Sequence, residues 1–219
     1  MAQSAELRER LRAIVAERMS RDSAHDLAHL DRVWLNVQKI APAEANQTVL
    51  LSAAYLHDLV NLPKDSPDRS QASRMAAAEA GPILSDLGLS ESEVKAAKHA
   101  IEAHSFSAGI PPETIEAQVL RDADRLDALG AIGVARTFAV AGALGQELYH
   151  PTDPFAVARD LNDIRFSVDH WRVKLLSLPK GMITDSGREL AQSRAALMIR
   201  FLDDFAEEIG ATVPEAWTT

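Results

Sequence analysis

The chain has 219 residues, 47% of them hydrophobic and 25% charged, and this size and composition allow a buried core without covalent cross-links. It contains no cysteine, which excludes disulfides, thiol nucleophiles and cysteine-bound zinc and fits a reducing cytoplasm. The formal net charge is -9 and no run of lysine and arginine occurs, so we expect no long DNA or RNA as a partner.

The first half of the chain carries the apolar spacing of amphipathic helices. Charged residues interrupt the N-terminal segment MAQSAELRERLRAIVAERM throughout, so we expect no signal peptide there. The stretch VLLSAAYLHDLV predicts a buried central helix, and the two prolines of 61–68 predict a loop after it. The pattern Ser90-Glu91-Ser92-Glu93 predicts a capped helix start. Helices are expected at 4–19, 26–41, 44–60, 70–87 and 90–104.

The second half predicts further helices at 113–129, 131–142, 155–178 and 186–210. The first two are separated near Gly130, and the glycine- and proline-containing connection from Gly142 to Pro154 is the expected subdomain boundary. Few segments alternate with a period of two, and no stretch approaches the roughly 18 apolar residues of a membrane helix. The sequence therefore predicts an all-α fold without a sheet and no membrane partner.

Three of the predicted helices carry side chains of the kind that bind metal ions, namely His29, His57-Asp58 and Asp124. The His57-Asp58 dipeptide ends an apolar run, and an ionised carboxylate is almost never buried without a partner. Neighbouring residues diverge by about 100° around a helix, yet both can reach one ion placed at the helix end. Imidazole and carboxylate together suit Mn²⁺, Fe²⁺, Zn²⁺ or Mg²⁺. Taken alone, such a dipeptide is more often a packed histidine beside a locally paired aspartate.

The order of these residues, with their surroundings, resembles the HD-domain metal phosphohydrolase superfamily. The run DADRLDALGAIGVAR, from Asp122 to Arg136, is similar to one branch of it, the single-domain bacterial HD phosphohydrolases. The resemblance is strong over about 20–140 and weaker through the C-terminal helices. Other matching positions are Asp31-Arg32-Val33, Asn61, Pro63-Lys64, Arg69-Ser70 and Ala103-His104-Ser105.

The resemblance implies an all-α HD-domain helical bundle with additional C-terminal helices. One domain would span 1–219, with its core at about 20–140 and a helical extension at about 150–211. The resemblance also implies one divalent metal ion, with Mn, Mg, Ni, Co, Fe and Zn as the alternatives. The ligands that it implies are His29, His57, Asp58 and Asp124.

Two histidines between the dipeptide and the last aspartate bear on the number of ions. Two-metal members of the superfamily carry extra ligand histidines in this part of the chain. Here His99 and His104 are five residues apart and do not share a helix face cleanly, so we expect one ion. We interpret His104 as a catalytic residue of the pocket and His99 as a surface residue. His25, one helical turn before His29, is either a group that orients a ligand or contacts the substrate, or a surface residue.

Other polar residues lie close to the ligands in sequence. Asp127 is three residues after Asp124 on the same helix face, so we predict a catalytic role in orienting water or a ligand. The alternative for Asp127 is a solvated helix carboxylate, and Asp122 is expected to be a cap or surface group. The nearest cations are predicted to neutralise phosphate oxygens of the substrate, with a plain surface role as the alternative: Lys64, Arg69 and Arg125.

The resemblance implies hydrolysis of a small phosphorylated substrate, a nucleotide or related phosphate ester. Our first hypothesis is cleavage of a nucleoside triphosphate to monophosphate and pyrophosphate. The alternatives are a 5′-nucleotidase, a cyclic phosphodiesterase and a non-catalytic sensor of metal and nucleotide. An oxygenase would need about six ligands around two irons, and the pattern offers four clear ones. We expect a cytoplasmic monomer or homodimer.

Overall fold

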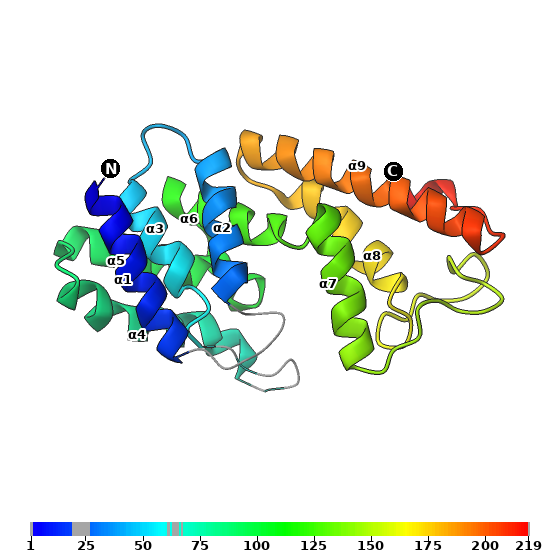
Figure 1. The fold of residues 1–219 in the computed structure, drawn as a ribbon, viewed down its shortest axis with the longest axis horizontal. Coiled ribbons are helices and arrows are strands. Elements are labelled where there is room, and N and C mark those ends of the chain that lie inside the picture. Colours follow the sequence, from blue (N-terminus) through cyan, green and yellow to red (C-terminus); the bar gives the residue numbers. More distant parts are fainter. Residues whose placement is uncertain (1, 19–26, 61, 63–65, 67, 219) are drawn as a thin grey trace. The chain divides into compact units, whose positions relative to one another are not determined.

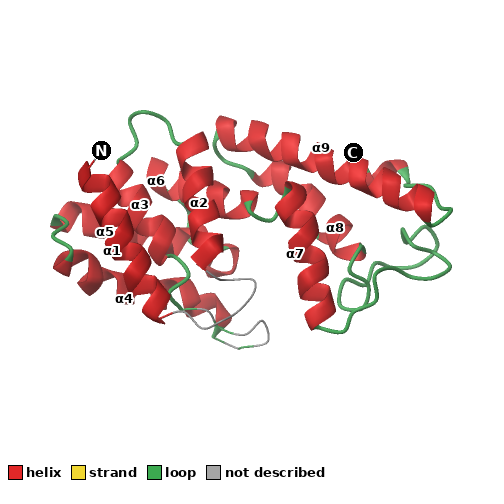
Figure 2. Ribbon diagram, in the orientation of Figure 1, coloured by secondary structure: helices red, strands yellow, loops and turns green. Residues whose placement is uncertain are grey.

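Helices form the regular structure of the computed structural model, which describes residues 2–18, 27–60, 62, 66 and 68–218 (Figure 1, Figure 2). The all-α prediction is confirmed for these residues. The chain divides into two compact units, Met1–Asp124 and Arg125–Thr219. The division therefore lies before the expected boundary at Gly142 to Pro154, and the single domain over 1–219 stays a prediction.

The first unit is built around one central helix, α3 (Gln47–Leu56). Every residue of α3 from Val49 to Leu56 is buried, which confirms the predicted buried central helix. It packs against α1, α2, α4 and α5 (Figure 1). The bounds of the other elements are α1 Ala2–Arg18, α2 Leu27–Ile40, η1 Arg69–Gln71, α4 Ala72–Asp86, α5 Glu91–His104 and η2 Phe106–Ala108, with α6 Ile115–Leu126 beginning in this unit.

Side-chain caps fix where two of these helices begin. The Asn46 side chain accepts hydrogen bonds from the backbone N–H groups of Thr48 and Val49, so α3 begins at Gln47, later than predicted. At the start of α5, Ser90 and Glu93 form the predicted capping box. His104 lies in the last turn of α5.

The second unit holds α7 (Gly130–Ala143) and the long α9 (Asp185–Glu208) around an aromatic core. In that core the Trp171 ring lies 5.6 Å from the Phe201 ring and 6.1 Å from the Phe138 ring, between centroids. Within the described residues no single helix is long and apolar enough to cross a membrane, although α6 and α7 would be if counted together across their bend. The shorter elements are α8 Asp169–Val173, η3 Leu175–Gly181 and η4 Glu215–Trp217.

The prediction of a helix over 155–178 is wrong, because the first half of this range is a loop held by side-chain hydrogen bonds. The Asp153 carboxylate accepts hydrogen bonds from the backbone N–H groups of Val157 and Ala158. Arg159 pairs with the fully buried Asp169 at 2.6 and 2.8 Å. Such bonds offer the backbone an alternative to helical hydrogen bonding. Within the predicted range, α8 and η3 are the helical parts.

Replacing Gly133 with alanine is expected to destabilise the protein by about 1–3 kcal/mol, as overpacking does. A Cβ atom at this position of α7 would lie 2.3 Å from the carbonyl oxygen of Ala128, which is backbone and cannot rotate away. Thermal unfolding followed by circular dichroism measures the loss. Gly142 is the control, since a Cβ there meets nothing within 4 Å and alanine should instead favour the helix. Equal melting temperatures for Gly133→Ala and the wild type would contradict this prediction.

Candidate metal centre

His57 and Asp58 stand at the C-terminal end of α3. The backbone N–H of His57 donates to the carbonyl oxygen of Ala53, and the His57 ring Nδ1 lies 3.0 Å from the carbonyl oxygen of Ala54. Because a carbonyl can only accept, Nδ1 carries the ring proton and Nε2 keeps its lone pair. Complete burial lowers the pKa of His57, so its ring is neutral, which is the form that binds metal ions.

Four side chains from α2, the end of α3 and α6 converge in the first unit. The His29 Nε2 atom lies 3.5 Å from an Asp124 oxygen and 3.6 Å from Asp58 Oδ2. The His57 Nε2 atom lies 3.6 Å from the same Asp58 oxygen and 3.9 Å from Asp124 Oδ1. Both histidines are buried, whereas the two carboxylates are partly exposed. The structure therefore brings together the four residues that were predicted as ligands.

A side chain that the sequence analysis missed, Asn36, holds Asp124 near His29. The Asn36 amide donates a hydrogen bond of 2.9 Å to the carbonyl oxygen of Ala123, the residue before Asp124. Asn36 is buried and lies seven residues after His29, two turns along the same face of α2. The sequence signal that could have identified Asn36 is its polar side chain among the mainly apolar residues of the buried face of α2.

His104 approaches Asp58 from the other side of the carboxylate. Its Nε2 atom lies 3.8 Å from Asp58 Oδ1, whereas His29 and His57 face Oδ2. Its Nδ1 atom lies 2.6 Å from the carbonyl oxygen of Ile101, so Nδ1 carries a proton and donates to that oxygen. The His104 and His57 rings are 4.8 Å apart between centroids, and His104 is also buried.

The donor set fits a divalent metal ion. The potential ligand atoms of His29, His57 and Asp124 lie within 4.8 Å of one another, and so do those of His57, Asp58 and His104. Among the described residues, the buried Nε2 atom of His57 has no hydrogen-bond partner, and burying a polar atom in this way is unfavourable. A divalent cation would satisfy this nitrogen and offset the two carboxylates at once.

Two of the predicted substrate-binding cations are held by backbone carbonyl oxygens. Arg69 Nη1 donates to Leu62 at 2.8 Å, and Arg125 Nη1 donates to Gly181 at 2.9 Å within the second unit. The third cation, Lys64, lies outside the described residues, as does His25. Phosphate binding by these residues stays a prediction.

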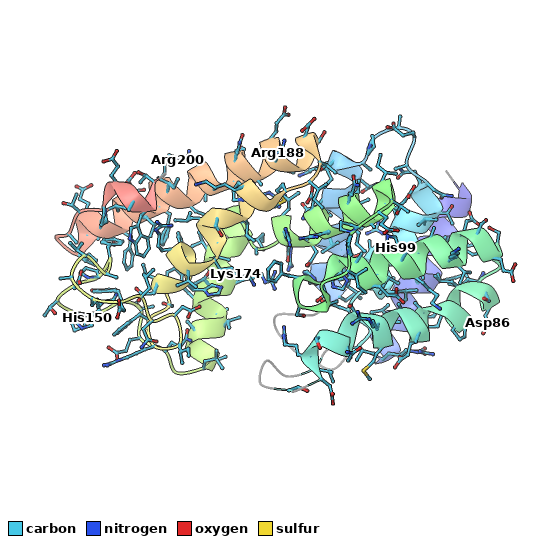
Figure 3. The ribbon with its side chains drawn as sticks, turned by 180° about the vertical axis from the view of Figure 1, so that it is seen from behind. Asp86, His99, His150, Lys174, Arg188 and Arg200 are labelled. Carbon is cyan, nitrogen blue, oxygen red and sulfur yellow. The ribbon has the colours of Figure 1, made fainter. Side chains whose placement is uncertain are left out.

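The remaining candidates differ in their surroundings. Asp127, in the second unit, is buried and accepts a 2.8 Å hydrogen bond from Arg136, and its catalytic role stays a prediction. Asp122 is fully buried, so its assignment as a cap or surface group is wrong. His99 lies on α5, half-buried and outside both donor sets, where its Nε2 atom accepts a hydrogen bond from the Glu113 backbone (Figure 3).

Comparison with known proteins gives consistent matches over most of the chain. The family model described as HD domain matches residues 26–129. The protein YpgQ of Bacillus subtilis is 33% identical over 192 residues, which cover 85% of each chain. The crystal structure of Bacillus subtilis YpgQ in complex with ADP is similar with a TM-score of 0.73 and 29% identity, over 94% of this chain and 96% of that one. An HD-superfamily hydrolase from Bacillus thuringiensis has a TM-score of 0.74 and 30% identity, over 95% and 100% of the two chains.

Proposed function

Because this chain belongs to the HD domain family, we propose that it is a metal-dependent phosphohydrolase whose single divalent ion is held by four side chains, those of His29, His57, Asp58 and Asp124. The convergence of these side chains, at 3.5–3.9 Å between nitrogen and oxygen atoms, is the observation that supports the proposal most. When bound, a divalent ion lowers the pKa of water and polarises a phosphate oxygen.

The chain's own residues orient the reacting groups. The backbone carbonyl of Ala54 accepts a hydrogen bond from His57 Nδ1. This bond fixes the ring orientation, and therefore the direction of the Nε2 lone pair, before substrate binds. We assign to His104 the role of accepting a hydrogen bond from the attacking water at Nε2, because its Nδ1 atom is committed to Ile101. Asp127, which follows the last residue of α6, is proposed to assist by orienting water or a ligand.

The proposed substrate is a nucleoside triphosphate, cleaved to a monophosphate and pyrophosphate. Two considerations support a nucleotide: Bacillus subtilis YpgQ was solved in complex with ADP, and a polyphosphate needs both a cation and nearby basic groups. In this chain Lys64, Arg69 and Arg125 are proposed to supply those groups, because the net charge of -9 offers no general attraction for an anion.

One screen tests the proposed function. Metal-depleted protein is reloaded singly with Mn²⁺, Mg²⁺, Ni²⁺, Co²⁺ or Fe²⁺ and is assayed with nucleotides and phosphate esters. Pyrophosphate release from triphosphates supports the proposal. Phosphate release from monophosphates would identify a 5′-nucleotidase instead, and opening of cyclic nucleotides a phosphodiesterase. Nucleotide binding without turnover under every metal would identify a sensor.

Replacing His104 with alanine is expected to lower kcat by about a hundredfold while metal content stays normal, the loss expected when one group that assists proton transfer is removed. The reason is that His104 faces Asp58 Oδ1, whereas His29 and His57 face Oδ2. Steady-state kinetics and elemental analysis of the same preparation measure the two quantities.

His99→Ala is the matched control for this variant, because His99 lies on the same helix and outside the cluster. It should keep wild-type kinetics. If His104→Ala loses its metal, His104 is a ligand and the assigned role is wrong.

A further inference from the structure

A hydrogen-bonded network joins α1 to the two helices that carry His29 and His57. The Tyr55 hydroxyl on α3 donates to Asp31 on α2 at 2.6 Å and accepts from Arg8 Nε on α1 at 2.8 Å. Arg12, also on α1, donates to both oxygens of Asp31 at 3.1–3.3 Å. Asp31 is the point at which all three helices meet.

The network is charged and only partly buried, since the Asp31 side chain is 23% exposed and those of Arg8 and Arg12 are 38% and 42% exposed. Burial raises the pKa of Asp31, but hydrogen bonds from Tyr55 and Arg12 outweigh this and hold the pKa below its usual value, so Asp31 is ionised. Burial, together with the bond to Asp31, raises the pKa of Tyr55 to about 12, so its hydroxyl stays protonated and donates. The Tyr55 ring is fully buried, which fixes the hydroxyl in place.

One face of α1 is built for this contact. Leu11, Arg12 and Val15 come three, four and seven residues after Arg8, so all four residues share one face of the helix. Leu11 and Val15 are buried and the two arginines reach Asp31 beside them. Apolar side chains therefore pack α1 against α2 and α3, and the two arginines add hydrogen bonds to Asp31.

The network contacts α2 and α3 on the faces turned away from the metal cluster. Asp31 is two residues after His29, and Tyr55 is two residues before His57. Two residues turn by about 200° around a helix, so each pair points in nearly opposite directions. The helix backbone between them is a short rigid link, and a shift at Asp31 or Tyr55 moves the histidine on the same turn.

We propose that α1 is a clasp that sets the spacing between His29 and the His57-Asp58 pair, with Asp31 and Tyr55 as positioning residues for metal binding. The inference rests on the metal site of the proposed function. The HD match covers residues 26–129, and α1 precedes it. The clasp is thus a part of this chain that the matched region does not contain.

The test uses metal-depleted full-length protein titrated with Mn²⁺ alone by calorimetry. Tyr55→Phe removes one hydroxyl and keeps the buried ring, while Arg8→Met combined with Arg12→Met removes both cations and keeps their apolar stems. Each should raise the Mn²⁺ Kd by about tenfold, the lower end of the loss for outer partners of metal ligands. The visible spectrum of the Co²⁺-loaded variants should also change, because the ligand spacing sets the coordination geometry.

Ser90→Ala is the matched control, since it removes the cap of α5 in the same unit and touches none of the clasp. It should lower the melting temperature and leave both the Mn²⁺ Kd and the Co²⁺ spectrum unchanged. If the clasp variants also melt earlier but keep the wild-type Kd and spectrum, the network is only structural and the proposal is overturned.

The outcomes also separate this proposal from the proposed function. A wild-type chain that binds none of the divalent ions overturns the metal site and the clasp together. Wild-type binding with unaffected clasp variants overturns the clasp alone. Weaker binding in Tyr55→Phe and in the double arginine variant, with Ser90→Ala unaffected, supports it.

Discussion

Replacing His57 with alanine is expected to abolish metal binding and hydrolysis together. The variant removes a neutral nitrogen donor whose lone pair faces Asp58 and Asp124 at 3.6 and 3.9 Å, and an incomplete coordination sphere loses both affinity and geometry. The loss of affinity should exceed about a hundredfold, the upper limit for residues that only orient ligands. Asp58→Ala should behave alike, because its two oxygens face histidines on both sides.

Elemental analysis and turnover on the best substrate of the screen measure these effects, with circular dichroism to verify folding. His170→Ala serves as the control, since His170 bonds Asp163 in the second unit and belongs to neither donor set. Unchanged metal content in both His57→Ala and Asp58→Ala would rule out this ligand set.

Removing the cation that contacts the substrate phosphate is expected to lower kcat/KM by about tenfold to a thousandfold. Lys64, Arg69 and Arg125 are each replaced with alanine, and at least one variant should show this loss with normal metal content. The effect is large because a charge-assisted contact strengthens as charge develops on the phosphate oxygens. Arg69 and Arg125 each donate a hydrogen bond from Nη1 to a backbone carbonyl oxygen, and this bond orients the guanidinium group.

Melting temperatures are measured beside the kinetics, since loss of those carbonyl bonds alone could reduce activity by damaging the fold. Arg200→Ala on the exposed surface of α9 is the control for charge removal without a site contact (Figure 3). Wild-type kinetics in all three variants would place the phosphate pocket elsewhere. The next residues to replace would then be His104, Arg165 and Lys174.

The helices with regular apolar spacing were predictable from the sequence, and so was the chemistry of the candidate centre. The buried α3 and the Ser90 capping box follow from local patterns that no distant contact overrides. The order His29, His57-Asp58, Asp124 pointed to a shared site through its resemblance to the HD-domain phosphohydrolases, since a His-Asp dipeptide alone is more often a packed histidine beside a paired aspartate. Which neighbours orient these residues depends on packing, so Asn36 and the Asp31 network were not foreseen.

The failures lie where polar side chains form specific long-range bonds. Residues 155–178 have helical spacing, but Asp169 is buried against Arg159 and the intervening backbone is held as a loop. Asp122 was expected at the surface and is fully buried. Helical periodicity records which positions are apolar, and it carries no information about a buried ion pair or a buried carboxylate. Such positions are resolved only by the tertiary structure.

The carbonyl groups that hold His57 and His104 belong to the last turns of α3 and α5. The last carbonyl groups of a helix have no hydrogen-bond partner within it. The C-terminal end of a helix therefore carries a partial negative charge of roughly half an elementary charge. Two such ends meet at Asp58, where the backbone dipoles of both helices add to the field of the carboxylates. For the proposed metal ion, the framework of the first unit would therefore favour a cation before any coordination bond forms, through peptide groups that no side-chain substitution removes.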